Sequence, residues 1–194
     1  MKHQITAADI LPMQDYARIR DEKRKAIIAI KQNRRVALGP YTTFYFENFD
    51  TMWLQVQEML RIEKGGAEQL EDELRAYNPL VPNGKELTAT VMFEIDDPIR
   101  RAQILGGLGG VEKTMELRLG GEIIKGRAEE DLDYTSEEGK ASSVQFVHFP
   151  FTAQQIAAFK DLKTEVIVAI SHPQYAHMAV MQQSVKQELA KDFD

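Results

Sequence analysis

Residues 49–64 read FDTMWLQVQEMLRIEK and carry the strongest helical pattern in the chain, together with its single tryptophan. Large apolar side chains recur at three- and four-residue steps, which places them on one side of a helix. They are Phe49, Met52, Trp53, Val56, Met59 and Leu60. Asp50 stands at the expected N-cap, and the two glycines after Lys64 permit the exit from the helix. The stretch therefore predicts a helix with one side in the core.

A second, narrower stripe on the same helix contains Leu54, Glu58, Arg61 and Ile62. It places a carboxylate and a guanidinium one turn apart between apolar neighbours. If this stripe is also covered, Glu58 acquires the shifted pKa of an acid–base group, and Glu58 and Arg61 become candidate catalytic residues. The alternative is a structural ion pair between the two side chains.

The rest of the chain alternates between strand and helix patterns. Strands are predicted at 35–38, 42–47, 87–95, 111–119, 122–126, 142–151, 165–171 and 178–181. Helices are predicted at 14–33, 67–77, 98–105, 152–161 and 184–193. Hairpin turns between strands favour antiparallel pairing, so the predicted fold class is α+β, with residues 1–194 as a single domain. A mainly antiparallel, curled sheet, with helices packed on its apolar face around the 49–64 helix, would explain the two stripes.

Two connecting segments have distinct compositions. Residues 127–141 contain six acidic residues and few apolar ones, so we expect this segment to be mobile at least in part. Tyr77 and Asn78, with the loop at 79–84, are candidates for lining a pocket, although turn formation alone explains these residue types.

Composition excludes several classes of protein. The chain has no cysteine, which rules out disulfides, thiolate ligands and a cysteine nucleophile. Its longest apolar run, Val166–Ile170, is five residues, whereas a membrane span needs about 20. The N-terminus lacks the apolar segment of a secretory signal. We therefore expect a cytoplasmic protein without a membrane partner; a homo-oligomer stays open.

The net charge of −6 is unevenly distributed. Residues 18–35 contain eight basic and two acidic side chains, which leaves −12 for the remainder of the chain. A basic strip of this kind is usually the solvated face of an amphipathic helix, so nucleic-acid binding is disfavoured.

Three of the four histidines are candidate metal ligands. His148 lies in a predicted strand, and His172 and His177 flank a turn after another strand. With Glu58 as a carboxylate ligand, they would suit a divalent metal such as iron, manganese or zinc. The alternative is that each is a hydrogen-bonded histidine of the core, because the spacing matches no known ligand motif.

Several stretches resemble a bacterial family of uncharacterised proteins of about this length. They are YARIRDEKR from Tyr16, RRVALGP from Arg34, QVQEMLRIE from Gln55, AYNPLVPNG from Ala76, VHFPF from Val147 and HPQYAH from His172. The family is a domain of unknown function without established catalytic residues. Its members tend to be encoded near rubrerythrin-like and iron–sulfur oxidoreductase proteins, which implies a redox-protein partner and a supporting role in oxidative-stress metabolism.

Two hypotheses of different classes follow from these observations. The first is a cytoplasmic binding or accessory protein that supports redox metabolism through protein contacts or a small ligand. The second is a metal-dependent enzyme that uses His148, His172 and His177 with Glu58. The sequence alone does not decide whether the chain is an enzyme.

Overall fold

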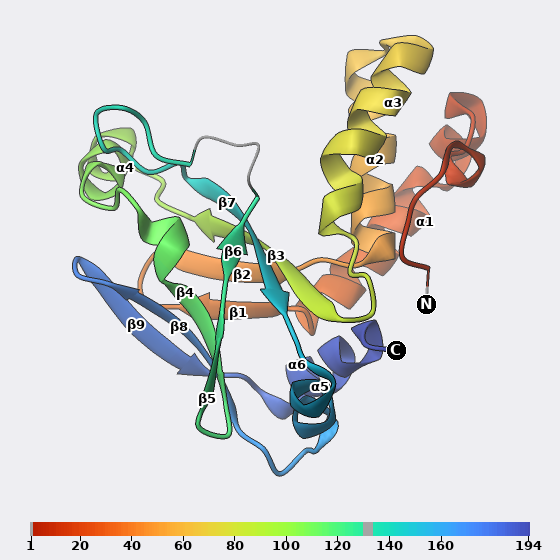
Figure 1. The fold of residues 1–194 in the computed structure, drawn as a ribbon. Helices are drawn as coiled ribbons and strands as arrows, with labels where there is room; N and C mark the ends of the chain where they lie inside the picture. Colours follow the sequence, from red (N-terminus) through yellow and green to blue (C-terminus); the bar gives the residue numbers. More distant parts are fainter. Residues whose placement is uncertain (1, 130–133) are drawn as a thin grey trace.

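The computed structural model describes residues 2–129 and 134–194 (Figure 1). In these ranges the α-helices are α1 (Met13–Gln32), α2 (Phe49–Glu63), α3 (Gly66–Tyr77), α4 (Pro98–Gly106), α5 (Ala153–Lys160) and α6 (Gln183–Leu189). The strands are β1 (Arg35–Leu38), β2 (Thr42–Phe46), β3 (Glu86–Phe93), β4 (Met115–Leu119), β5 (Glu122–Lys125), β6 (Arg127–Ala128), β7 (Val144–Pro150), β8 (Val166–His172) and β9 (Tyr175–Val180). Short 3-10 helices cover Ala7–Asp9, Asn78–Leu80, Val111–Thr114 and Ala190–Asp192.

The strands form two antiparallel sheets. The first, which we call sheet A, has the order β1-β2-β3-β7-β6, and the second, sheet C, has the order β5-β4-β8-β9. The chain passes from sheet C to sheet A at Gly126, between β5 and β6. A Cβ atom at Gly126 would lie 2.7 Å from a methyl carbon of Val147, so the crossing is tight. The predicted α+β class with antiparallel strands is confirmed.

The main hydrophobic core lies between the two sheets. Strand β3 shows the predicted alternation, because Leu87, Ala89, Val91 and Phe93 are all buried in this core. Side chains of sheet C, such as Leu117 of β4, belong to the same cluster. The inward rows of the two sheets thus bury each other, as in other two-layer folds.

Helices α1, α2 and α3 stand together to one side of the strands (Figure 1), and we call them the helical arm. A second hydrophobic cluster, separate from the sheet core, holds the arm together and includes Met52, Val56 and Leu80. Trp53 is half-buried at its edge, where the indole N–H donates to the main-chain oxygen of Asp9 (2.8 Å). The arm therefore has its own packing and meets the sheets only at its base.

The expected position of the 49–64 helix inside a curled sheet is wrong. Neighbouring segments and one outer sheet face cover the first apolar stripe, because helices can bury a stripe as well as a sheet can. Arg61 and Ile62 of the second stripe are exposed. The N-cap is Asn48 and not Asp50: the Asn48 side chain accepts a hydrogen bond from the Thr51 main-chain N–H (3.0 Å). Lys64 takes the left-handed conformation that ends the helix, with φ 57°.

Smaller differences occur elsewhere. Residues 111–114, expected to begin a strand, form a 3-10 helix before β4, and β9 begins at Tyr175 instead of Met178. In the acidic segment 127–141, residues 130–133 lie outside the described residues, whereas Thr135 pairs with Ala141 in an isolated β-bridge. No helix in the described ranges combines the length and the apolarity that crossing a membrane requires.

Candidate functional site

His148 lies on β7, on the outer face of sheet A, between two carboxylates. Its Nδ1 is 3.2 Å from Glu86 Oε2, and its Nε2 is 2.7 Å from Glu129 Oε2. Burial lowers the pKa of the imidazole, but the hydrogen bonds to Glu86 and Glu129 outweigh this effect and raise the pKa above 6.5. Both ring nitrogens are thus occupied by interactions that favour the protonated form.

His172 and His177 lie on β8 and β9 of sheet C and have other partners. The Nε2–H of His172 donates to the main-chain oxygen of Gly109 (3.3 Å), and its Nδ1 accepts from the Gln174 N–H (3.2 Å). The ring of His177 packs edge-on against Tyr175, with 4.4 Å between ring centroids. In residues 2–129 and 134–194, no three His, Asp or Glu side chains are arranged to hold a metal ion. The structure does not bring the predicted histidine ligands together.

Glu58 pairs with helix α1 and not with Arg61. Its carboxylate accepts two hydrogen bonds from Arg20 (2.7 Å each) and one from the Tyr16 hydroxyl (2.6 Å). The hydrogen bonds from Arg20 lower the pKa of Glu58 from 4.5 to about 2. Arg61 points to the exposed side of α2, so the predicted ion pair between Glu58 and Arg61 is wrong. Because Arg20 and Tyr16 belong to α1, these hydrogen bonds let Glu58 link α2 to α1.

A buried ion pair joins the end of α1 to the C-terminus. Arg34 and Asp192 are each 1% exposed. Arg34 Nη1 donates to Asp192 Oδ1 (3.1 Å), and Nη2 also donates to this carboxylate. The same guanidinium donates to the main-chain oxygens of Phe46 (3.0 Å) and Glu47 (2.9 Å). Arg34 therefore fixes the main chain at the point where β2 leads into α2.

A cleft of about 400 Å³ lies where the base of the helical arm meets the outer face of sheet A. We call it the arm cleft. Helices α1, α2 and α3 contribute to its wall, and strands β2, β3 and β7 form its floor. It is lined by Lys31, Tyr45, Glu47, Met52, Gln55, Tyr77, Leu80, Thr90, Met92, Val144 and Phe146. Tyr77 is thus a pocket residue, as the sequence suggested, whereas the Asn78 side chain bonds the main chain of Ile5.

Glu47 is the unusual residue of the arm cleft. Its main chain is fixed, because its N–H donates to the Thr88 oxygen (2.9 Å) and its own oxygen accepts from Arg34. The residue is only 3% exposed, and its Oε2 atom is buried without a hydrogen-bond partner among the described residues. A buried carboxylate oxygen in this state lowers stability, since the protein does not replace the hydration that it loses.

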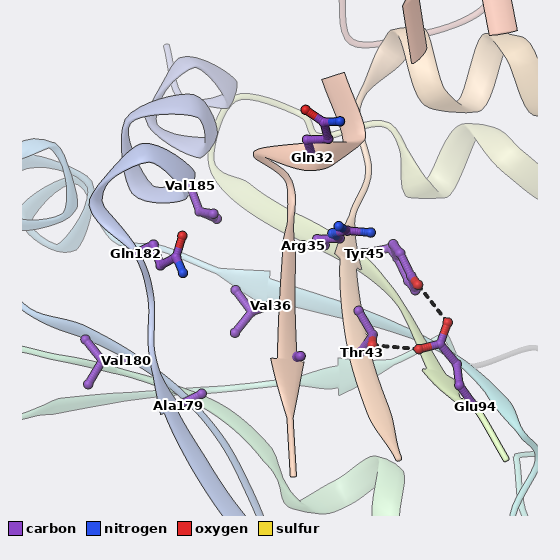
Figure 2. Close-up of a pocket in the computed structure, with 11 residues that line it drawn as sticks. Gln32, Arg35, Val36, Thr43, Tyr45, Glu94, Ala179, Val180, Gln182 and Val185 are labelled. Atoms are coloured by element: carbon purple, nitrogen blue, oxygen red, sulfur yellow. Dashed lines mark hydrogen bonds between the residues drawn. The ribbon is translucent and has the colours of Figure 1, made fainter. Parts of the chain in front are cut away.

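A second concavity, which we call the edge groove, has a volume of about 540 Å³. It lies where β1 and β9, the end strands of the two sheets, meet α6. Figure 2 shows the carboxylate of Glu94 between Thr43 and Tyr45 in this groove, and both hydroxyls donate to it at 2.7 Å. Burial, and secondly the hydrogen bond to Glu94, raises the pKa of Tyr45. The carboxylate of the edge groove, unlike Glu47, already has its partners.

Part of the pattern that would identify Glu47 as a site residue is visible in the sequence. It places Thr43, Tyr45 and Glu47 on alternate positions, hence on one face of the strand region, but it gives no indication of what covers that face. The missing partner of Glu47 depends on how α2 and α3 fold back over β2, which is a tertiary feature. Glu58, in contrast, is a candidate in the sequence because of its apolar neighbours. In the structure both of its carboxylate oxygens accept hydrogen bonds from Arg20.

The family model described as "Protein of unknown function (DUF3501)" matches residues 4–193, and the chain belongs to this family. The chain is also similar to a solved structure described as a novel protein of unknown function from Burkholderia pseudomallei K96243, determined at 1.90 Å resolution. The two share 32% sequence identity and superpose with a TM-score of 0.91, over 98% of this chain and 100% of the other. No curated protein matches the sequence.

Proposed function

We propose that this family member is a binding protein that holds a small organic molecule in the arm cleft. The observation that carries the proposal is the composition of the cleft. Its wall and floor are mainly apolar, through Met52, Leu80, Val144 and Phe146, and polar residues complete the lining. Ligand sites of proteins have this combination, in which apolar walls supply affinity and polar groups supply orientation.

The polar groups of the cleft come from different elements. Gln55 of α2 donates to the hydroxyl of Tyr77 at the end of α3 (3.4 Å), which links the two helices. Thr90 lies on the central strand β3 and forms part of the floor. A ligand would therefore contact the arm and the sheet together, and its binding would stabilise the arm against the sheet.

Binding of an uncharged aromatic probe tests the proposal. We expect 2-phenylethanol to shift the backbone amide NMR signals of cleft residues such as Met52, Thr90 and Phe146 saturably. Val144→Trp, which fills the cleft, should abolish these shifts. The matched control is Ile123→Trp, because Ile123 is an exposed apolar residue on the other sheet. Equal binding to both variants, or no shift of cleft signals in the unchanged protein, would contradict the proposal.

A further inference from the structure

Glu47 is exceptional among the buried acidic residues of this chain. Apart from it, the buried carboxylates in the described ranges are Glu73, Glu112, Glu116 and Asp192. Each of these accepts a hydrogen bond: from Gln69 (3.1 Å), Thr135 (3.3 Å), Arg118 (2.8 Å) and Arg34, respectively. The sequence thus supplies a donor wherever a buried acid serves the fold, and Glu47 does not follow this pattern.

Glu47 lies at the wall of the arm cleft. Hydrogen bonds of its main chain to Thr88 and to the Arg34 side chain hold the residue in place, and Glu47 is one of the residues that line the arm cleft. Asn48, which follows it directly, caps helix α2. The main chain of Glu47 is therefore fixed at a junction of two elements, and preorganisation of this kind lowers the entropic cost of orienting a ligand group.

We propose that the ligand of the arm cleft is an amine: an apolar, preferably aromatic body with a cationic nitrogen that donates hydrogen bonds to Glu47. This inference rests on the proposed binding function and names its ligand class. A protonated amine supplies the hydrogen-bond donor that the buried oxygen lacks, and its positive charge strengthens that hydrogen bond. The body of the ligand would pack against Met52, Leu80 and Phe146, on the apolar part of the wall and floor.

Lys31 is the one lysine or arginine among the cleft-lining residues, and it bears on the same inference. Its ammonium does not hydrogen-bond the buried Oε2 of Glu47, which has no partner in the described part of the chain. It does place a positive charge in the cleft, and this charge repels a cationic ligand. Removing the charge is therefore expected to raise the affinity for amines and to leave uncharged ligands unaffected.

The test compares three probes that share a phenyl body: 2-phenylethylamine, 2-phenylethanol and 3-phenylpropanoate. Affinities come from the same amide NMR titration. We expect the unchanged protein to bind the amine about tenfold or more tightly than the alcohol, since hydrogen bonds to charged groups contribute that much. The carboxylate should bind most weakly. Glu47→Gln should reduce the ratio of amine to alcohol affinity to about one.

Two further variants distinguish the effect of charge in the cleft from a general effect of losing a buried carboxylate. Glu73→Gln makes the same chemical change at a buried, hydrogen-bonded glutamate outside the cleft, and it should keep the amine preference. Lys31→Met keeps the length of the stem, removes the charge, and should raise the amine affinity several-fold.

The outcomes distinguish the ligand class from the site. Equal affinities for amine and alcohol, an amine preference that survives Glu47→Gln, or no gain in Lys31→Met would overturn the amine inference while the alcohol still occupies the cleft. If none of the probes shifts the cleft signals, the proposed binding function fails as well.

Discussion

Arg34 contacts two buried acidic residues, Asp192 and Glu47, in different ways. It donates two hydrogen bonds to the carboxylate of Asp192, but it reaches only the main-chain oxygen of Glu47. One acid is fully paired, and the side chain of the other is left with a buried oxygen that has no partner in the described residues. A guanidinium stands beside both residues, so the difference lies in how each side chain is directed.

This contrast separates two uses of buried charge. A paired carboxylate such as Asp192 connects parts of the fold, and losing its partner is costly. An unpaired carboxylate such as Glu47 lowers stability, and we attribute it to an interaction outside the fold. Changing a paired group should therefore lower the stability of the protein, whereas changing Glu47 should not.

The largest effect is expected for Asp192→Ala. The variant leaves the guanidinium of Arg34 buried without a countercharge, which we expect to lower the free energy of unfolding by about 3–5 kcal/mol. Urea unfolding at neutral pH measures the change. Glu188→Gln is the control: Glu188 is a more distant and partly exposed neighbour of Arg34 (3.8 Å), and its loss should matter by less than about 1 kcal/mol. Similar losses in both variants would contradict the central role of Asp192.

A smaller effect is expected for Glu58→Gln, which weakens the contact of α2 with Arg20 and Tyr16. We expect a loss of about 1–2 kcal/mol at pH 7. The pKa of Glu58 is lowered from 4.5 to about 2 in the folded protein, so its contribution is present above pH 4.5 and disappears as the pH falls toward 2. Unfolding free energies of both proteins across this range test the pH dependence. A constant difference would show that Glu58 acts through packing alone.

A third effect, of about 0.5–1.5 kcal/mol, is expected for His148→Gln. The pKa of His148 is raised above 6.5 in the folded protein, so protonation favours folding. Its contribution is full below pH 6.5 and is lost as the pH rises through the raised pKa. Urea unfolding between pH 5 and 9 should therefore show the difference from the unchanged protein shrinking with increasing pH. A difference that grows with pH would mean that the neutral imidazole is the stabilising form.

The sequence predicted most of the elements because their patterns are local. The alternation in 87–93 and the two-glycine turn after Leu119 fix strands and a hairpin without reference to the rest of the chain. The position of the 49–64 helix in the fold, in contrast, cannot be predicted from its local sequence pattern. The first stripe showed that one side is covered, but helices and sheets cover an apolar stripe equally well, and only the tertiary structure shows that α3 packs there. The second stripe suggested a further covered side, whereas its Ile62 is 65% exposed.

The candidate site was less predictable for a related reason. Glu58 has conspicuous apolar neighbours in the sequence, yet its partner Arg20 lies 38 positions away on another helix. Glu47 sits in an ordinary strand pattern, and what distinguishes it is the lack of a partner in space. Burial of a polar residue can be anticipated from a pattern, whereas the presence of its hydrogen-bond donor cannot.

The central claim is that Glu47 serves a ligand and not the fold. The most direct test is the thermal unfolding of Glu47→Gln with and without 2-phenylethylamine. We predict that the variant without ligand is as stable as the unchanged protein, or more stable by up to about 1 kcal/mol, because a neutral amide is less costly to bury than a carboxylate. We also predict that the amine stabilises the unchanged protein and not the variant. A variant that is clearly less stable, and that still gains stability from the amine, would contradict the account.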